Sequence, residues 1–153
     1  KLTEAAVVPG LDGEKMSKSY GNTIDLFDAP KTVRKRIMSI KTDSTPMEAP
    51  KNPEKCNVFA LYRLMARAEE VKQLEQRYRA GGMGYGDAKK ELAEVVERVL
   101  GPARERRAEL ECNPDFVEDV LSTNGTKARR VAQGVMAEVR EACGLLASKD
   151  THR

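Results

Sequence analysis

Residues 56–82 read CNVFALYRLMARAEEVKQLEQRYRAGG, and apolar side chains recur in this stretch at helical spacing. Positions three or four residues apart lie on one face of an α-helix. The residues on the apolar face are Val58, Leu61, Tyr62 and Met65. We expect one helix from about Cys56 to Ala68 and a second from about Glu69 to Arg79. Gly81 and Gly82 should end the second helix, because glycine adopts the left-handed C-cap conformation easily.

Helical patterns also flank this stretch. On the N-terminal side, Asp28 is a candidate N-cap for a helix with Pro30 in its first turn. The apolar face of that helix would hold Val33, Ile37 and Ile40. Residues 42–54 contain three prolines among polar residues, so we expect a connector there.

On the C-terminal side, a long helix is expected from Asp87 to about Glu111, and Pro102 should kink or divide it. Asn113-Pro114 should open a helix to about Leu121, because proline suits the first helical position. Asn124-Gly125 should then break the chain before a last helix over about Thr126–Cys143. The glycine-rich run 81–86 follows a helix, so it is read as a helix–helix connector rather than a phosphate loop.

The composition agrees with a helical fold. The chain has 153 residues, of which 33% are charged and only 5% aromatic, with no Trp. A β-sandwich would require more aromatic and β-branched residues. We therefore predict a mostly α fold, an antiparallel helical bundle preceded by a loop segment. The net charge of +3 is too small to indicate nucleic-acid binding by itself.

The cysteine pattern indicates a reducing compartment. Cys56, Cys112 and Cys143 are odd in number and far apart, without a CxxC pair, so neither a zinc site nor a disulfide framework is expected. We expect all three to be buried as small apolar residues. The sequence has no run of 18 apolar residues and no signal-peptide pattern, and a cytoplasmic location without membrane contact is predicted.

Residues 1–27 show no long periodicity and are expected to form an exposed, mobile loop, with a short strand at Ala5–Val8. This segment contains KMSKS at 15–19, in which Lys15 and Lys18 stand three residues apart among hydroxyl groups. Two ammonium groups on flexible stems suit a polyphosphate, and they can follow charge that develops on a leaving group. A solvated loop with incidental lysines is the alternative.

The stretch PGLDGEKMSKSYGNTI at 9–24 resembles the second signature of class I aminoacyl-tRNA synthetases, and the tryptophanyl-tRNA synthetase family in particular. The similarity continues through Asp28–Lys31, Thr42–Ser44 and residues 81–89. It implies three segments: the end of a catalytic domain with the KMSKS loop at 1–27, a helical anticodon-binding domain at 28–147, and a tail at 148–153.

The resemblance implies activation of tryptophan with ATP and transfer of the aminoacyl group to tRNA(Trp). It assigns Lys15 and Lys18 a catalytic role at the ATP phosphates, with the larger effect expected for Lys18. The implied ATP-binding set is Lys15, Met16, Ser17, Lys18 and Ser19. Met16 would pack the loop against its neighbours, and the two serines would touch phosphate or orient the loop.

Part of the family pattern is missing. The family's Rossmann-like catalytic domain carries histidines at a helix start, whereas the only histidine here is His152. The resemblance therefore implies a C-terminal half that cannot form the adenylate alone. It also implies ATP with Mg²⁺, bound mainly by the missing N-terminal domain, and a homodimer of the full-length enzyme. No metal site is expected in this chain, and the fragment is expected to be monomeric.

Two basic clusters are candidate tRNA contacts. The candidates are Lys31, Arg34, Lys35, Arg36, Lys127, Arg129 and Arg130. Lys127 is expected near a helix start, where a cation is unfavourable, which favours a functional role for it. Binding of phosphates by such clusters is independent of base sequence. The alternative is a solvated helix face.

Three other functions stay open from the sequence. The chain could belong to a tyrosyl-tRNA synthetase, the nearest relative of the tryptophanyl family. It could also be a stand-alone helical RNA-binding module or a purely structural interaction bundle. Salt-dependent binding of tRNA would separate the structural bundle from the RNA-binding functions.

Overall fold

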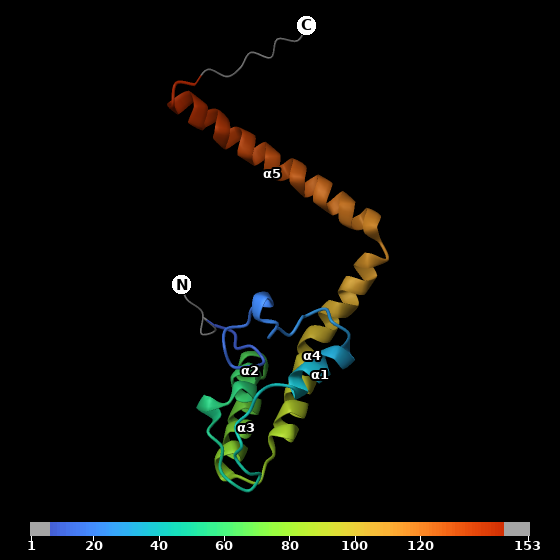
Figure 1. Cartoon of the computed structure of the whole chain (residues 1–153). Coiled ribbons are helices and arrows are strands. Elements are labelled where there is room, and N and C mark those ends of the chain that lie inside the picture. Colours follow the sequence, from blue (N-terminus) through green and yellow to red (C-terminus); the bar gives the residue numbers. More distant parts are fainter. Residues whose placement is uncertain (1–6, 146–153) are drawn as a thin grey trace. The chain divides into compact units, whose positions relative to one another are not determined.

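The computed structural model describes residues 7–145, and these residues form helices and loops without a β-strand (Figure 1). The predicted mostly α fold is confirmed. The helices are the 3₁₀ helices η1 (Lys18–Tyr20) and η2 (Pro53–Lys55), and the α-helices α1 (Pro30–Met38), α2 (Asn57–Met65), α3 (Ala68–Ala80), α4 (Tyr85–Glu111) and α5 (Pro114–Ala142). The chain divides into two compact units, Lys1–Glu105 and Arg106–Arg153.

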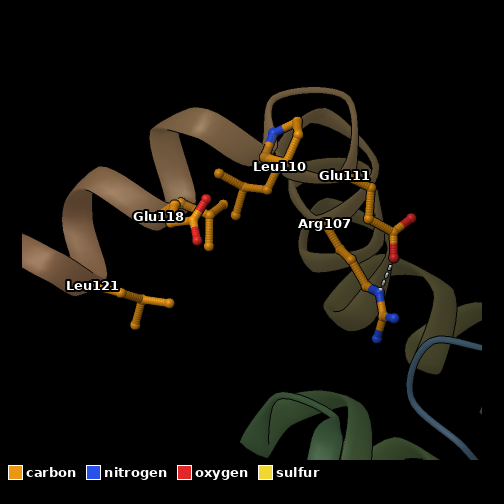
Figure 2. A pocket seen from close by; sticks show the side chains of 7 residues that line it. Arg107, Leu110, Glu111, Glu118 and Leu121 are labelled. Carbon is orange, nitrogen blue, oxygen red and sulfur yellow. Dashed lines mark hydrogen bonds and ion pairs between the residues drawn. The ribbon is translucent and has the colours of Figure 1, made fainter.

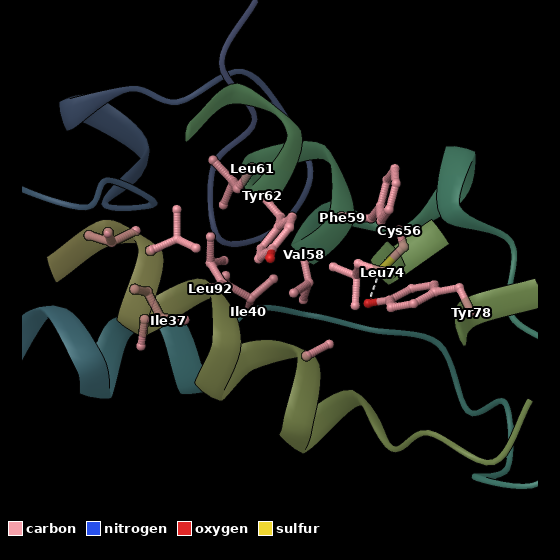
Figure 3. Packing of buried hydrophobic residues seen from close by; sticks show 14 of the residues in the cluster. Ile37, Ile40, Cys56, Val58, Phe59, Leu61, Tyr62, Leu74, Tyr78 and Leu92 are labelled. Carbon is pink, nitrogen blue, oxygen red and sulfur yellow. Dashed lines mark hydrogen bonds between the residues drawn. The ribbon is translucent and has the colours of Figure 1, made fainter. Parts of the chain in front are cut away.

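Apolar side chains from α1 to α4 form the core of the first unit (Figure 3). Fully buried members include Ile37, Ile40, Val58, Leu74, Tyr78 and Leu92. Val33 and Ile37 of α1, together with Ile40, are buried as their spacing predicts. The predicted apolar face of α2 is likewise buried at Val58, Leu61 and Tyr62, while Met65 is partly buried against the core.

The two helices predicted from residues 56–80 are present, and the break after them has a packing reason. Gly81 has φ 79° but ψ −178°, so it is not the left-handed C-cap expected for this position. A Cβ on Gly81 would lie 2.4 Å from the Glu48 carbonyl oxygen. Gly82 also has positive φ, and its amide donates to the Met47 carbonyl at 2.9 Å. The glycines therefore allow the connector to approach the chain closely.

A buried lysine holds this connector. Lys51 is 4% exposed, and its Nζ donates to the carbonyl oxygens of Pro46 at 2.8 Å and of Met47 and Ala49 at 3.3 Å each. The ammonium also lies 5.2 Å from the centre of the Tyr85 ring. These contacts compensate for the loss of water around the charge, because a buried ammonium needs hydrogen-bond acceptors.

The start of α1 and the middle of α4 differ from the sequence predictions. Ala29 is the N-cap of α1, and the Asp28 carboxylate instead lies 3.8 Å from Nε of Arg36. Pro102 lies inside α4, which continues to Glu111 without division. A proline ring crowds the Cβ of the preceding residue, and Gly101 has none, so the helix continues at a lower steric cost.

The predicted break at Asn124-Gly125 is wrong, because α5 continues through it. The Asn124 side chain donates to the Val120 carbonyl at 2.8 Å, and the Thr126 hydroxyl donates to the Ser122 carbonyl at 3.0 Å. A single glycine costs a helix only about 1 kcal/mol, which a long helix tolerates. The predicted start is confirmed, since Pro114 is the first residue and the Asn113 side chain accepts from the Phe116 amide at 3.3 Å.

The second unit contains the end of α4 and all of α5, and no side chain of α5 is buried within the described residues. A groove at the turn between these helices is lined by Leu110, Pro114, Val117 and Leu121, with the Arg107–Glu111 ion pair beside it (Figure 2).

No helix within residues 7–145 is long and apolar enough to cross a membrane. Cys56 is buried as expected, whereas Cys112 and Cys143 are exposed, so that expectation is wrong for these two.

A bidentate ion pair joins α3 to α4. The terminal nitrogens Nη1 and Nη2 of Arg98 each donate to one carboxylate oxygen of Glu70 at 2.7 Å, and Glu70 also accepts from the Arg67 amide at 2.8 Å. The hydrogen bonds from Arg98, followed by that from Arg67, lower the pKa of Glu70 to about 2. Because the folded-state pKa lies below the ordinary value, this carboxylate stabilises the fold above about pH 4.5. The stabilisation is lost as the pH falls towards 2.

Replacing Glu70 with glutamine is therefore expected to make the free energy of unfolding depend less on pH between pH 5 and pH 2. The variant should be less stable than the wild-type chain at pH 5, and the difference should shrink steadily down to pH 2. Urea unfolding of both chains at several pH values measures it. Glu69→Gln, at an exposed carboxylate that pairs with Lys72, is the matched control and should show a small difference. A gap for Glu70→Gln that does not change with pH would contradict the prediction.

Candidate functional site

The segment 9–22, here called the lysine loop, folds back on itself through main-chain hydrogen bonds. Pro9 and Lys15 form an isolated antiparallel bridge, and the Gly10 amide donates to the Glu14 carbonyl at 2.7 Å. The Leu11 amide donates to the Asn22 carbonyl at 3.0 Å, which closes the loop. The strand expected at Ala5–Val8 is absent from Val7 and Val8, and its first two residues lie outside the described part of the chain.

Lys15 and Lys18 are both exposed on this loop, as the sequence predicts for an exposed segment. Within residues 7–145, no carboxylate forms an ion pair with either ammonium group. Lys18 opens η1, which ends at Gly21 with φ 64°, a conformation that favours glycine. Two exposed ammonium groups on one short segment are suited to bind an anion with several charges.

The three other residues of the motif, Met16, Ser17 and Ser19, differ in their exposure to solvent. Ser17 is half-buried and its amide donates to Oδ1 of Asn22 at 2.8 Å, whereas Ser19 is exposed. Met16 packs against the core and lines an apolar cavity of about 110 Å³. The other lining residues are Val8, Ile24, Leu26, Leu61, Met65, Leu92, Val96 and Leu100. The loop thus has its methionine on the helices and its lysines in solvent.

Two arginines hold the segment that follows the loop. Arg36 of α1 donates to the Thr23 carbonyl at 3.0 Å, and Nε of Arg104 in α4 donates to the Leu26 carbonyl at 3.0 Å. The Arg104 guanidinium also contacts Glu97 at 2.5 Å. The segment that follows the lysine loop is therefore attached to α1 and α4 through its main-chain carbonyl groups.

The predicted tRNA contacts occupy different surroundings. Lys31, Arg34 and Lys35 are exposed on α1, whereas Arg36 is half-buried and bonded within the chain. Lys127, Arg129 and Arg130 are exposed in the middle of α5. Lys127 is therefore not near a helix start, and the expectation based on the helix dipole is wrong. The two clusters belong to different compact units.

The residue that sequence reasoning missed is Asn22. It is 4% exposed, and its side chain bonds Asp12, Lys15 and Ser17. An asparagine that follows a glycine in a polar loop gives no periodic signal, so nothing in the pattern marked it as buried. The hydrogen bonds of its side chain depend on the folded conformation of the loop, which the sequence pattern does not predict.

The described residues do not provide a metal site. No group of three or more histidine, cysteine, aspartate or glutamate side chains within residues 7–145 is arranged to hold an ion.

Comparisons with known proteins agree with the motif. A family model described as tRNA synthetases class I (W and Y) matches residues 1–101. The tryptophan–tRNA ligase of Rhodopirellula baltica is 51% identical over 144 residues, which cover 94% of this chain and 45% of that protein. The Fusobacterium nucleatum tryptophan–tRNA ligase is 45% identical and covers 95% of this chain and 44% of its own length.

A solved structure supports the same relationship. The tryptophanyl-tRNA synthetase of Campylobacter jejuni, complexed with ADP and tryptophan, matches with a TM-score of 0.82 and 46% identity. The match covers 93% of this chain and 44% of that protein. The chain thus spans less than half the length of these relatives. Because the family model covers most of its residues and includes the lysine loop, the chain belongs to the class I tRNA synthetases of the tryptophan and tyrosine group.

Proposed function

We propose that this chain is the C-terminal part of a tryptophan–tRNA ligase and that its lysine loop binds the phosphates of ATP. The observation that carries the proposal is the exposed pair Lys15 and Lys18, on a loop held by the core and without carboxylate partners in the described residues. The names of the relatives favour tryptophan over tyrosine.

In the proposed reaction, a carboxylate oxygen of tryptophan attacks the α-phosphorus of ATP. The bond between the α-phosphorus and the bridging oxygen breaks, and pyrophosphate leaves with the bonding electrons. Negative charge therefore grows on the leaving group in the transition state. Lys15 and Lys18 would stabilise that charge, and a contact that strengthens in the transition state raises kcat.

The remaining residues of the motif would support this contact. The exposed Ser19 hydroxyl can donate to a phosphate oxygen, and the half-buried Ser17 can orient the start of η1. Met16, packed on the apolar cavity, would keep the loop on the helices. Mg²⁺ would arrive with the ATP phosphates and neutralise part of their charge, while most of its binding site would lie outside this chain.

In the second half-reaction, a terminal ribose hydroxyl of tRNA(Trp) would attack the adenylate carbonyl, with AMP as the leaving group. The helical part of this chain would contact the anticodon end. Lys31, Arg34 and Lys35 on α1, and Lys127, Arg129 and Arg130 on α5, are exposed and can pair with phosphates. Arg36 is less suited, because it already bonds Thr23 and Asp28.

The free cysteines are compatible with a location in the cytoplasm.

Pyrophosphate exchange tests this proposal. Here the full-length enzyme means a polypeptide of the relatives' length that contains this chain, and we take it to be a homodimer. This enzyme is expected to exchange pyrophosphate into ATP when tryptophan is present. Residues 1–153 alone are expected to show no exchange, because the catalytic domain with the amino-acid pocket would lie outside this chain. Exchange with tyrosine only would assign the chain to a tyrosyl-tRNA synthetase.

Two further outcomes would overturn the proposal in different ways. If the full-length enzyme activated neither amino acid but bound tRNA with steep salt dependence, the chain would be an RNA-binding module. If neither exchange nor salt-dependent binding occurred, a structural interaction bundle would be the better description. Exchange by residues 1–153 alone would contradict the expected need for the remainder of the enzyme.

A further inference from the structure

Asn22, the last residue of the lysine loop, is buried and bonds the main chain on both sides of Met16. Its Nδ2 donates to the Lys15 carbonyl at 3.2 Å and to Oδ1 of Asp12 at 2.8 Å. Its Oδ1 accepts the Ser17 amide at 2.8 Å. One carboxamide thus fixes the two peptide groups that flank Met16, one following Lys15 and one preceding Ser17, the residue next to Lys18.

The surroundings of position 22 fit an asparagine side chain. A larger side chain would lack space, and a side chain without N–H donors could not form the same hydrogen bonds. A Cβ on Gly10 would lie 2.3 Å from Nδ2 of Asn22, so the loop closes on the amide without spare room. Asp12 faces the same amide and also accepts the Glu14 amide at 3.1 Å. The hydrogen bond from Asn22 lowers the pKa of Asp12, which keeps the acceptor charged. An aspartate at position 22 could accept from Ser17 but could not donate to Lys15 or Asp12.

We propose that Asn22 is a positioning residue for phosphate binding, because its carboxamide sets the main-chain frame from which the Lys15 and Lys18 ammonium groups reach the leaving pyrophosphate. This inference rests on the proposed function. Asn22 does not touch the nucleotide, and it acts only through the lysines. A displacement of about 1 Å in a group that stabilises a transition state can cost on the order of 10²-fold in rate.

The test is Asn22→Asp in the full-length enzyme, measured by tryptophan-dependent pyrophosphate exchange. The substitution removes two donors and places a second carboxylate beside Asp12. We expect kcat to fall by about 10-fold to 100-fold, with the KM for tryptophan within about twofold of the wild-type value. Asn52→Asp is the matched control, because among the described residues the Asn52 side chain acts as an acceptor, from the Glu54 amide, and aspartate can replace it. That control should retain the wild-type rate.

A double-mutant cycle separates positioning from general support of the fold. In a background with both Lys15→Ala and Lys18→Ala, Asn22→Asp should lower kcat by only about threefold or less, since its effect travels through the two lysines. An equal loss in both backgrounds, or a loss confined to the KM for tryptophan, would overturn the inference. If Lys18→Ala itself had no effect, the proposed function would fail instead.

Gly10→Ala provides a second variant that leaves the chemistry of Asn22 unchanged. The added methyl group would collide with the Asn22 carboxamide and should displace it. We expect a loss of kcat of similar size, which also shrinks in the background with both Lys15→Ala and Lys18→Ala. This variant decides the question if Asn22→Asp does not fold, and a wild-type rate for a folded Gly10→Ala enzyme would count against the inference.

Discussion

Lys18→Ala in the full-length enzyme is expected to lower kcat for tryptophan-dependent pyrophosphate exchange by about 10²-fold to 10³-fold. Losses of this size are typical when one donor to a developing charge is removed from an active site. Lys18 is exposed, begins η1, and pairs with no carboxylate in the described residues, so its ammonium is available to the leaving group. The KM for tryptophan should change by less than about twofold, because the contact proposed for the loop is with phosphate rather than with the amino acid.

Lys55→Ala is the control for this substitution. Lys55 is an exposed lysine at the end of η2 in the same compact unit, outside the lysine loop. Its removal changes the net charge equally and should leave kcat unchanged. If Lys18→Ala lowered only the affinity for tryptophan, the assigned role would be wrong.

Tyr78→Ala is expected to lower the free energy of unfolding by about 3–5 kcal/mol, the usual cost of truncating a large aromatic side chain in a core. Tyr78 is fully buried on α3. Its ring centre lies 5.6 Å from that of Phe59 and 6.2 Å from that of Tyr85, and its hydroxyl is 3.5 Å from Sγ of Cys56. Burial raises the pKa of the hydroxyl, so the side chain stays neutral.

Urea unfolding of residues 1–153 measures this effect. Tyr78→Phe is the matched control, because it keeps the ring and removes only the hydroxyl, and it should cost about 1 kcal/mol. Since small domains are stabilised by about 5–15 kcal/mol, the alanine variant should unfold at a much lower urea concentration. A stability within about 1 kcal/mol of wild type for Tyr78→Ala would show that the ring is not a central part of the core.

Local periodicity predicted the helices well, because burial of an apolar face imposes it directly. Val33, Ile37 and Val58 were identified as core residues from spacing alone, and each is buried. Helix ends were less predictable, since they depend on contacts distant in sequence. Asp28 was expected to cap α1, but Arg36 attracts its carboxylate.

The lysine loop shows the same limit. The positions of Lys15 and Lys18 were evident from the motif, and the structure shows both to be exposed. The frame beneath them was not predictable, because Asn22 is buried only after segments around Gly10 and Ser17 come together. Similarly, charge clustering could not show that Arg36 is bonded within the chain while Lys35 is exposed.

The most direct test of phosphate binding by the lysine loop is the first turnover of the full-length enzyme. Enzyme saturated with tryptophan is mixed with ATP in a rapid-quench apparatus, and adenylate is measured over a range of ATP concentrations. We expect Lys18→Ala to lower the maximal rate by about 10²-fold or more, with only a few-fold change in the ATP concentration that gives half that rate. An unchanged maximal rate would contradict the assignment of Lys18 to the departing pyrophosphate.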